Sequence, residues 1–454
     1  MKKSSVLAIL FCIMLVFTAC TSVPSETEDN TTATQVQTTE AAIPDDGVTD
    51  IALSDAEILV DGKPAEKDTA NAVYIANDIV YYEEGKDFTY GEGTSEDAHS
   101  ADDAQAHTVV HITKAGEYSL SGKLSKGQIA VDLGSDAKED PQAVVTLVLS
   151  GVDITCEVAP AVIFYNVYEC SNNDADTATK DVDTTSAGAN VIVEDGTDNV
   201  VNGSYVAKIY KPESVVLSAD GTEVEDASKL HKYDGAFYSK MSMNVGGGSE
   251  GTGVLTINAE NEGLDSEMHL TINGGNINIY SGNDGINTNE DYVSVTTVNG
   301  GTLNIRVTGE TGEGDGIDSN GWLVINGGEV IAEACSFSAD SGVDSDMGIH
   351  INGGKVIACG SMMDRIEDGS QPYVTFNLWQ NQGGETFIVK NSSGESVAEF
   401  SPENDCSLIL YSSPDLNSQD TYALFAGDTQ VAEGGDGFSG GGGMHLPGGE
   451  PPRF

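Results

Sequence analysis

The stretch His269-Leu-Thr-Ile-Asn-Gly-Gly-Asn-Ile-Asn-Ile-Tyr280 decides the fold, because its pattern returns at regular intervals along the chain. The tripeptide Asn-Gly-Gly begins at Asn273, Asn299, Asn326 and Asn352, with spacings of 26, 27 and 26 residues. A repeat of this length is typical of a solenoid, in which every copy stacks on the next one. The order of the copies along the chain therefore predicts their order in space.

Each period contains three short runs in which apolar and polar residues alternate. In one period these runs are 269–273, 276–280 and 285–289. Three strands of about five residues, joined by glycine-rich turns, make one coil of a parallel β-helix. A leucine-rich repeat would need its leucine and asparagine framework, and a propeller blade would need about 40 residues. We therefore predict an all-β fold, a parallel β-helix whose open ends are covered by capping strands.

The alternation also separates inward from outward side chains. Each run supplies one inward aliphatic position per period: Ile272, Val298, Ile325 and Ile351 in the first run, Ile277, Leu303, Val330 and Val356 in the second, and Leu264, Ile286, Ile317 and Val343 in the third. Small hydroxyl residues follow two positions later in the third run, at Ser266, Thr288, Ser319 and Ser345. We expect the asparagines of Asn-Gly-Gly to stack as a ladder along the turns.

The outward residues of the third run are acids or amides in every period. They are Asp265 and Glu267, Asn287 and Asn289, Asp318 and Asn320, and Asp344 and Asp346, with Asp284 and Asp315 in the turns just before. Coils about 4.8 Å apart would stack them into two columns, in which neighbouring carboxylates repel each other unless a cation lies between them. Oxygen ligands without His or Cys favour Ca²⁺. The sequence therefore predicts calcium at these positions; the alternative is a solvated acidic face.

The N-terminus resembles a bacterial lipoprotein signal. Met1-Lys-Lys3 is basic, an apolar run of about a dozen residues follows, and Phe17-Thr-Ala-Cys20 ends it. We expect residues 1–19 to be a signal peptide, Cys20 to carry lipid, and the Thr/Ser/Glu-rich residues 20–50 to be a disordered tether. An ordinary secretory signal is the alternative. Either way, the folded part is expected outside the cell, and with the lipid it sits at the outer face of the membrane.

The folded domain is expected at residues 51–432, with the repeat core at about 232–360 and a C-terminal cap at 361–432. The Gly/Pro-rich residues 433–454 are expected to be a disordered tail. Five cysteines remain in the domain, Cys156, Cys170, Cys335, Cys359 and Cys406, and no CxxC spacing marks a zinc ribbon. We interpret them as small buried apolar residues, and the sequence leaves possible disulfides open.

The charge of the chain excludes one large class of partners. With 73 Asp and Glu against 20 Lys and Arg, the formal net charge is −53. Nucleic acids and anionic membrane surfaces are bound by clustered Lys and Arg, which this chain lacks. A cation is the partner that such a charge favours.

Several motifs together resemble one protein family. They are the run Lys232-Tyr-Asp-Gly-Ala-Phe-Tyr-Ser-Lys240, the Asn-Gly-Gly turns with Asp-Gly-Ile-Asp-Ser at 315–319, and Ser413-Pro-Asp-Leu416. Upstream, 112–122 and 149–154 look like the same family, so that the resemblance covers about 107–446. This is the bacterial carbohydrate-binding domain-containing lipoprotein family. It implies a right-handed, single-stranded parallel β-helix like that of pectate lyases, bound Ca²⁺, and non-catalytic binding of cellulose or pectate.

The resemblance implies that the calcium ligands lie at Asp315 and Asp318 and at their equivalents Asp284, Asn287, Asp265 and Asp344. For the glycan, the sequence itself offers aromatic and cationic side chains that are outward or close to turns: Tyr280, Arg306, Tyr292 and Trp322. We expect a monomer that binds cellulose or an acidic pectin such as polygalacturonate.

Two other functions stay open from the sequence. One is a structural adhesin or spacer in which Ca²⁺ only stabilises the coils. The other is a pectate-lyase-like enzyme, which would need a strong base beside the calcium ion. Within the repeats the basic residues are Arg306 and Lys355, and the alternation places Arg306 on the second run, away from the acidic columns. We therefore expect no catalysis.

Overall fold

In the computed structural model of the chain, residues 47–435 are described, without the side chains of residues 380–382. The predicted signal peptide, Cys20, most of the tether and most of the tail lie outside these residues. The described part consists almost entirely of strands, with one short helix, α1 (Ala101–Gln105), and two 3-10 turns, η1 (Ala137–Glu139) and η2 (Pro212–Ser214). The all-β prediction is confirmed. Between residues 47 and 435, no helix is long and apolar enough to span a bilayer.

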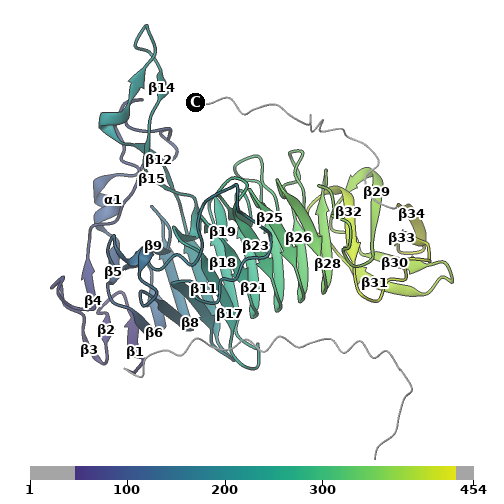
Figure 1. Ribbon diagram of the computed structural model, residues 1–454, viewed down its shortest axis with the longest axis horizontal. Coiled ribbons are helices and arrows are strands. Elements are labelled where there is room, and N and C mark those ends of the chain that lie inside the picture. Colours follow the sequence, from purple (N-terminus) through teal and green to yellow (C-terminus); the bar gives the residue numbers. More distant parts are fainter. Residues whose placement is uncertain (1–46, 436–454) are drawn as a thin grey trace, which may run out of the picture. The chain divides into compact units, whose positions relative to one another are not determined.

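Strands from equivalent places in successive periods pair in parallel, one upon the next. The first stack, from the first run of each period, is β17 (Met243–Gly247), β20 (Leu270–Ile272), β23 (Val295–Val298), β25 (Trp322–Ile325) and β27 (Gly348–Ile351). The second stack is β18 (Val254–Ala259), β21 (Asn276–Ser281), β24 (Thr302–Val307), β26 (Glu329–Glu333) and β28 (Lys355–Gly360). Figure 1 shows β18, β21, β26 and β28 following one another in this order.

The third stack is a separate seven-stranded sheet. Its parallel strands are β5 (Thr108–Ile112), β7 (Gly127–Asp132), β9 (Val162–Asn166), β16 (Gly235–Ser239), β19 (Glu262–Ser266) and β22 (Ile286–Thr288), and β4 (Val73–Ala76) lies antiparallel on β5. Beyond β22 the stack continues as single bridges from Ile286 to Ile317 and from Ile317 to Val343. These residues are the equivalent positions in the third runs of successive periods.

Parallel pairing also reaches upstream of the repeats. In this part the strands are β10 (Ala189–Val193) on β17, β11 (Asp198–Gly203) on β18, β8 (Val145–Cys156) on both β10 and β11, β6 (Gly116–Leu124) on β8, and β1 (Thr49–Leu53) on β6. Alternating β-branched residues favour such strands, since they pack well on a pleated surface.

The inward side chains form the core, as the alternation predicts. Ile277, Leu303 and Val330 stand in register on β21, β24 and β26, and each is at most 1% exposed. The other predicted aliphatic positions are buried to the same extent, and Ser266, Thr288, Ser319 and Ser345 are buried too. The predicted register is therefore confirmed in all three stacks.

The asparagine ladder is present at the turns between the first and second stacks. The Nδ2 of Asn299 donates to Oδ1 of Asn273 at 2.9 Å, and Asn326 and Asn352 continue the series at 2.9 and 2.8 Å. The last glycine of each tripeptide has positive φ, for example +85° at Gly301, where a Cβ would lie 2.5 Å from the carbonyl oxygen of Gly275. The Asn-Gly-Gly sequence is thus required by the close approach of successive turns.

Antiparallel strands lie at the ends and in one insertion. At the start they are β2 (Leu59–Val60) and β3 (Lys63–Pro64); the insertion consists of β12 (Val206–Tyr210), β13 (Val216–Leu217), β14 (Val224–Asp226) and β15 (Lys229–Tyr233). At the far end they are β29 (Tyr373–Gln382), β30 (Phe387–Asn391), β31 (Ser396–Phe400), β32 (Cys406–Ser412), β33 (Tyr422–Ala426) and β34 (Thr429–Gly435). Because β32 lies antiparallel on β28, it covers the last parallel strand.

The cysteines behave as the sequence suggests. None of the five within the described range forms a disulfide, Cys359 shares a side-chain hydrogen bond with Cys406, and all but the partly exposed Cys170 are buried. The interpretation as small buried residues is confirmed for these four.

The stacked core predicts a large cost for one buried truncation. Leu303→Ala removes a side chain that lies between Ile277 and Val330 in the second stack, so we expect the unfolding free energy to fall by about 2–5 kcal/mol. Thr302→Ala, on the same strand but half-exposed, is the control and is expected to cost less than about 1 kcal/mol. Urea denaturation followed by circular dichroism measures both. Equal costs for the two variants would contradict the inward assignment of Leu303.

Candidate metal centre

The outward carboxylates of the third stack have the predicted register, but much of their face is buried. Asp265 on β19 pairs with Asn287 on β22, and the two are 0% and 8% exposed. The backbone N–H of Asp318 donates to the carbonyl oxygen of Ile286 at 2.8 Å, and that of Asp344 to the carbonyl oxygen of Ile317 at 2.7 Å. The half-buried Asp318 and Asp344 therefore continue the column. A solvated acidic face, the alternative from the sequence, does not describe Asp265 or Asn287.

Three buried carboxylates meet at the upstream end of this column. Asp234, Glu262 and Asp265 each place one oxygen within 4.8 Å of the others. Asp234 precedes β16, and Glu262 begins β19, so that neighbouring coils bring the three together. The ammonium group of Lys232 pairs with Asp234 at 2.5 Å. One ammonium faces three carboxylates here, so the group keeps a negative charge when all three are ionised.

Some of the oxygens in this column have no hydrogen-bond partner. Among residues 47–435, the unpartnered buried oxygens on the acids and amides of the third stack are Glu262 Oε2, Asp265 Oδ2, Asn287 Oδ1 and Asp344 Oδ1. In Glu262, Asp265 and Asn287 the second polar atom of the side chain is hydrogen-bonded. Asn287 Nδ2 donates to Glu262 Oε1 at 3.1 Å, and Asn289 Nδ2 donates to Asp265 Oδ1 at 2.5 Å. A buried acceptor without a donor costs about 1–3 kcal/mol. A proton or a cation would remove that cost, and the donor set, oxygen only, fits Ca²⁺.

The protonation equilibria reflect the same crowding. Burial raises the pKa of Glu262 well above its usual value, and the charge of Asp265 adds to this. Burial likewise raises the pKa of Asp265, with Asp234 as the next cause. Burial lowers the pKa of Lys232, but its pairing with Asp234 outweighs this and the pKa is raised overall. Lys232 is therefore held as an ammonium ion.

The turn acids downstream form a second group. The backbone N–H of Asp315 donates to Asp284 Oδ1 at 2.7 Å, and that of Ser341 donates to Asp315 Oδ1 at 2.5 Å. Each turn acid therefore accepts a hydrogen bond from the next coil. Burial raises the pKa of Asp284 to about 7 and that of Asp315 to about 9. The nearest additional causes are the charges of Asp318 and Asp344, respectively.

Asp318 and Asp344 belong to this second group. Burial raises the pKa of Asp318 to about 6 and that of Asp344 to about 7, with Asp346 and Asp364 as the next causes. Asp344 also shares a side-chain hydrogen bond with Asp364. Because both groups are carboxyls, one of them must be protonated for this bond to form. These close acids are the kind of site at which a divalent cation replaces protons.

The second predicted column is in register, but much of it is engaged within the protein. Glu267 accepts from Lys229 Nζ at 2.8 Å and from the Tyr238 hydroxyl at 2.6 Å. Asn289 donates to Asp265, as described above, and Asn320 donates to Asp291 Oδ1 at 3.0 Å. Asp346 ends the column and is exposed. The first column and its turn acids are thus better suited to a cation than the second.

The candidate glycan contacts are scattered. Tyr280 and Tyr292 are 42% and 55% exposed, and Trp322 is half-buried at the start of β25. Arg306 Nε donates to Asn404 Oδ1 at 2.9 Å, and the guanidinium pairs with Glu403. Arg306 therefore connects β24 to the turn between β31 and β32.

Two strongly exposed aromatic residues are not predicted by the sequence pattern. Trp379 on β29 is 97% exposed, and Phe337 is 77% exposed. Neither lies in the repeat pattern, so alternation gave no signal for them.

Asp234 and Asp364 also escaped the set of predicted ligands. For Asp234 a signal existed, because Asp234-Gly235 repeats the Asp-Gly pairs at 284–285 and 315–316. In the pairing of β16 with β19, however, Asp234 is offset by one residue, since Gly235 and Tyr238 stand opposite Glu262 and Asp265. Asp364 follows the last repeat and had no such signal.

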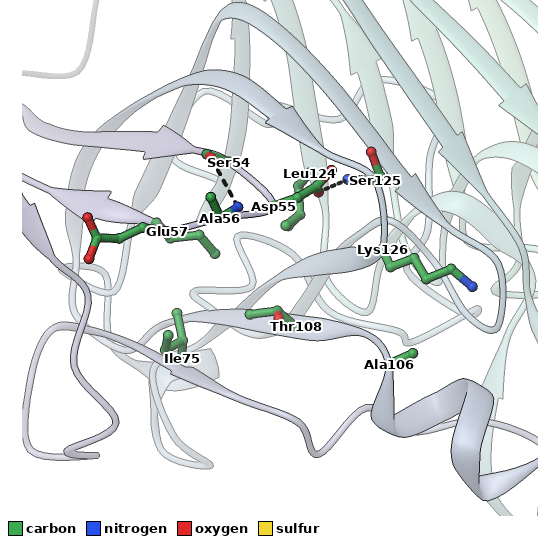
Figure 2. A pocket seen from close by; sticks show the side chains of 11 residues that line it. Ser54, Asp55, Ala56, Glu57, Ile75, Ala106, Thr108, Leu124, Ser125 and Lys126 are labelled. Atoms are coloured by element: carbon green, nitrogen blue, oxygen red, sulfur yellow. Dashed lines mark hydrogen bonds between the residues drawn. The ribbon is translucent and has the colours of Figure 1, made fainter.

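A cavity of about 440 Å³ lies elsewhere, between the 54–58 loop and the 124–126 turn. Figure 2 shows Glu57 and Lys126 at opposite ends of it. Asp55 Oδ1 accepts the backbone N–H of Ser125 at 2.6 Å, and Lys126 pairs with Glu157 at 2.7 Å. Because Asp55 and Lys126 already have partners, this cavity offers less chemistry than the stacked carboxylates.

Comparisons with known proteins agree on a family. The family described as carbohydrate-binding domain-containing protein matches residues 106–450. A curated protein of Acetivibrio thermocellus with the same description is 30% identical over 171 residues, which are 37% of this chain and 44% of that protein. The match thus spans less than half the length of that relative.

One solved structure is also similar. It is described as a polysaccharide lyase-like protein from C. thermocellum, in a gadolinium derivative. The match covers 68% of this chain and 90% of that one, with 19% identity and a TM-score of 0.38.

The raised pKa values predict that the metal-free protein loses stability as the pH rises. Carboxyl groups in the unfolded chain have pKa values of about 4. In the folded protein the pKa is about 7 for Asp284 and Asp344 and about 9 for Asp315. The folded state therefore binds more protons in between. Its extra stability is complete below about pH 4 and is lost as the pH rises through these folded values. We expect the melting temperature in chelator to fall by several degrees between about pH 5 and pH 9.

Asp315→Asn should flatten that decline, because the amide keeps the acceptor for Ser341 but cannot ionise. Asp198→Asn, at an exposed position on β11, is the control and should leave the profile unchanged. Added Ca²⁺ should raise the melting temperature more at about pH 8 than at pH 5, since protons compete for the same oxygens. Thermal scans across pH measure all three. A calcium effect of equal size at both pH values would contradict binding at these carboxylates.

Proposed function

Because the chain belongs to the carbohydrate-binding domain-containing protein family, we propose that it is a non-catalytic, calcium-binding cell-surface protein that binds plant cell-wall polysaccharide. The glycans that fit this proposal are cellulose and acidic pectins such as polygalacturonate. Membership of the family supports carbohydrate as the ligand class; calcium and the identity of the glycan are the parts that we add.

The observation that carries the calcium proposal is the set of unpartnered oxygens on stacked, buried acids and amides. Asp234, Glu262, Asp265 and Asn287 would hold one ion at the upstream end. Asp284, Asp315, Asp318 and Asp344, with Asp364, would hold ions further along. A proton can occupy the same oxygens at low pH, but at neutral pH a divalent cation removes more of the mutual repulsion.

Calcium would also explain how so acidic a protein binds an acidic glycan. At a net charge of −53, the chain repels a polyuronate unless positive charge lies between them. A calcium ion that keeps open coordination positions supplies that charge and accepts a uronate carboxylate. The chain's own carboxylates orient the ion, and the stacking of coils spaces such sites regularly along the protein.

The finer features of fold and location belong to the same proposal. The parallel pairing of equivalent residues in successive periods supports a right-handed, single-stranded parallel β-helix. The sequence Phe17-Thr-Ala-Cys20 supports attachment of lipid at Cys20, which would place the domain at the outer face of the cell membrane. A monomeric state is a separate part of the proposal.

A lyase is the enzyme alternative, and one observation bears on it. Lys232 lies beside the upstream carboxylates, where a lyase would need a base next to its calcium. The pairing with Asp234 keeps Lys232 protonated, which does not suit a base. An adhesin or spacer with stabilising calcium is the structural alternative. Both become outcomes of the experiment below.

The test is binding of polygalacturonate and cellulose by isothermal titration and pull-down, with Ca²⁺ and with chelator. We expect the wild type to bind at least one of them. Chelator should lower the affinity for the acidic glycan at least tenfold. Asp265→Asn should lower this affinity by a similar factor. The substitution keeps the Oδ1 acceptor for Asn289 but replaces Oδ2, the oxygen without a hydrogen-bond partner. Asp198→Asn is the matched control and should bind like the wild type.

Three results would contradict the proposal. Absence of binding to either glycan would leave a structural adhesin as the better reading. Ultraviolet absorbance from an unsaturated product would show a lyase. Binding that persists in chelator while the fold stays intact would remove calcium from recognition.

A further inference from the structure

A second, polar cavity of about 270 Å³ lies beneath the long loop that joins β9 to β10. Loop residues between Cys170 and Asp183 form one wall, and His269 and Val293 form the other. The loop wall carries the hydroxyls of Ser171, Thr177 and Thr179 and the carboxylates of Asp181 and Asp183. None of these residues is part of the candidate metal centre.

The loop is fixed at both ends to the first stack. Near its start, Glu169 accepts the backbone N–H of Ser242 at 2.7 Å and the Ser242 hydroxyl at 2.8 Å. Near its end, the Thr184 hydroxyl lies 2.8 Å from Asn244 Oδ1 and 2.7 Å from Thr271 Oγ1. The cavity is therefore held in shape by contacts with the strands.

The hydrogen bonding of His269 defines its chemistry in this cavity. The backbone N–H of Val295 donates to His269 Nδ1 at 3.0 Å, so that nitrogen carries no proton. In a neutral imidazole the proton is then on Nε2, which makes Nε2 a donor. His269 is 1% exposed, and its Nε2 has no hydrogen-bond partner among residues 47–435.

These contacts narrow the class of ligand. A metal ion needs the lone pair of a ring nitrogen, but Nε2 carries the proton and Nδ1 is occupied by Val295. An anion would face the carboxylates of Asp181 and Asp183. Asp181 pairs with Lys180 at 2.6 Å and Asp183 Oδ1 accepts from Thr185, so one ammonium group offsets only part of this negative charge. A neutral ligand with many hydroxyl groups satisfies both sides, because each hydroxyl can accept from a histidine and donate to a carboxylate.

We propose that this cavity is a subsite for one neutral sugar ring, with His269 Nε2 donating to a sugar oxygen and the loop hydroxyls and carboxylates accepting from its hydroxyl groups. The inference rests on the proposed carbohydrate binding and adds a site independent of calcium. The cavity volume is close to the lower limit for small-ligand pockets, about 300 Å³, which suits a single ring better than a longer segment.

The first test follows the His269 ring directly in the wild-type protein. Histidine labelled with ¹⁵N reports the proton on Nε2, and glucose, cellobiose and cellotriose are titrated into the protein in chelator. We expect the His269 Nε2–H signal to shift and saturate with cellotriose, and trigalacturonate to leave it unchanged. A signal that no neutral sugar moves would mean that water alone occupies the cavity, which overturns the inference.

The second test fills the cavity. Ala178→Leu places a larger side chain in the lining, and we expect cellotriose affinity to fall at least tenfold. Ala175→Leu lies on the same loop, is exposed and does not line the cavity, so it should stay within twofold of wild type. His269→Asn keeps an acceptor for the backbone N–H of Val295 but loses the Nε2 donor. It should also lower the affinity for cellotriose at least tenfold.

The two proposals fail in different ways. If the wild type binds neither neutral nor acidic glycans under any condition, the proposed function itself is wrong. If it binds cellotriose, but Ala178→Leu and His269→Asn bind as well as wild type, only the subsite is wrong. Calcium-dependent binding of polygalacturonate should be unchanged in Ala178→Leu, and its loss there would contradict a separate subsite.

Discussion

The parallel hydrogen bonding between successive coils is the constraint on which the rest of this structure depends. It repeats at about 4.8 Å and sets each residue directly against its equivalent one period away. For apolar residues this is favourable, since Ile277, Leu303 and Val330 bury one another in a continuous column. The same register makes the asparagine ladder, in which each amide donates to the one before it. A single backbone pattern thus produces both the core and its turns.

That register has a cost wherever the repeated residue is charged. The structure lessens the repulsion locally: Asn287 interrupts the acids, Asp284 and Asp315 accept backbone N–H groups, and Lys232 pairs with Asp234. These contacts do not satisfy every oxygen, and burial then raises the pKa values of those acids. A fold that clusters unpartnered carboxylate oxygens in this way is suited to binding a cation there, because binding recovers stability that the metal-free state lacks.

Residue patterns predicted the stacked part well and the added parts poorly, for one reason. Alternation and period report on residues that meet their own equivalents, so the core, the ladder and the carboxylate register follow from them. Arg306 is outward as expected, but its partners Glu403 and Asn404 come from the turn between β31 and β32, about a hundred residues away. Burial of Asp265 and the pairing of Glu267 with Lys229 likewise involve residues outside the repeat pattern. No periodicity connects such segments.

The sequence by itself determined the all-β class, the spacing of the coils and which side chains face inward, because these depend on local alternation and on a period of 26 or 27 residues. Tertiary structure decided which outward groups are buried, which oxygens lack partners, and how the β9–β10 loop encloses His269. The physical reason is that desolvation and hydrogen-bond satisfaction depend on everything packed around a group. Much of that packing comes from distant segments whose positions no local pattern encodes.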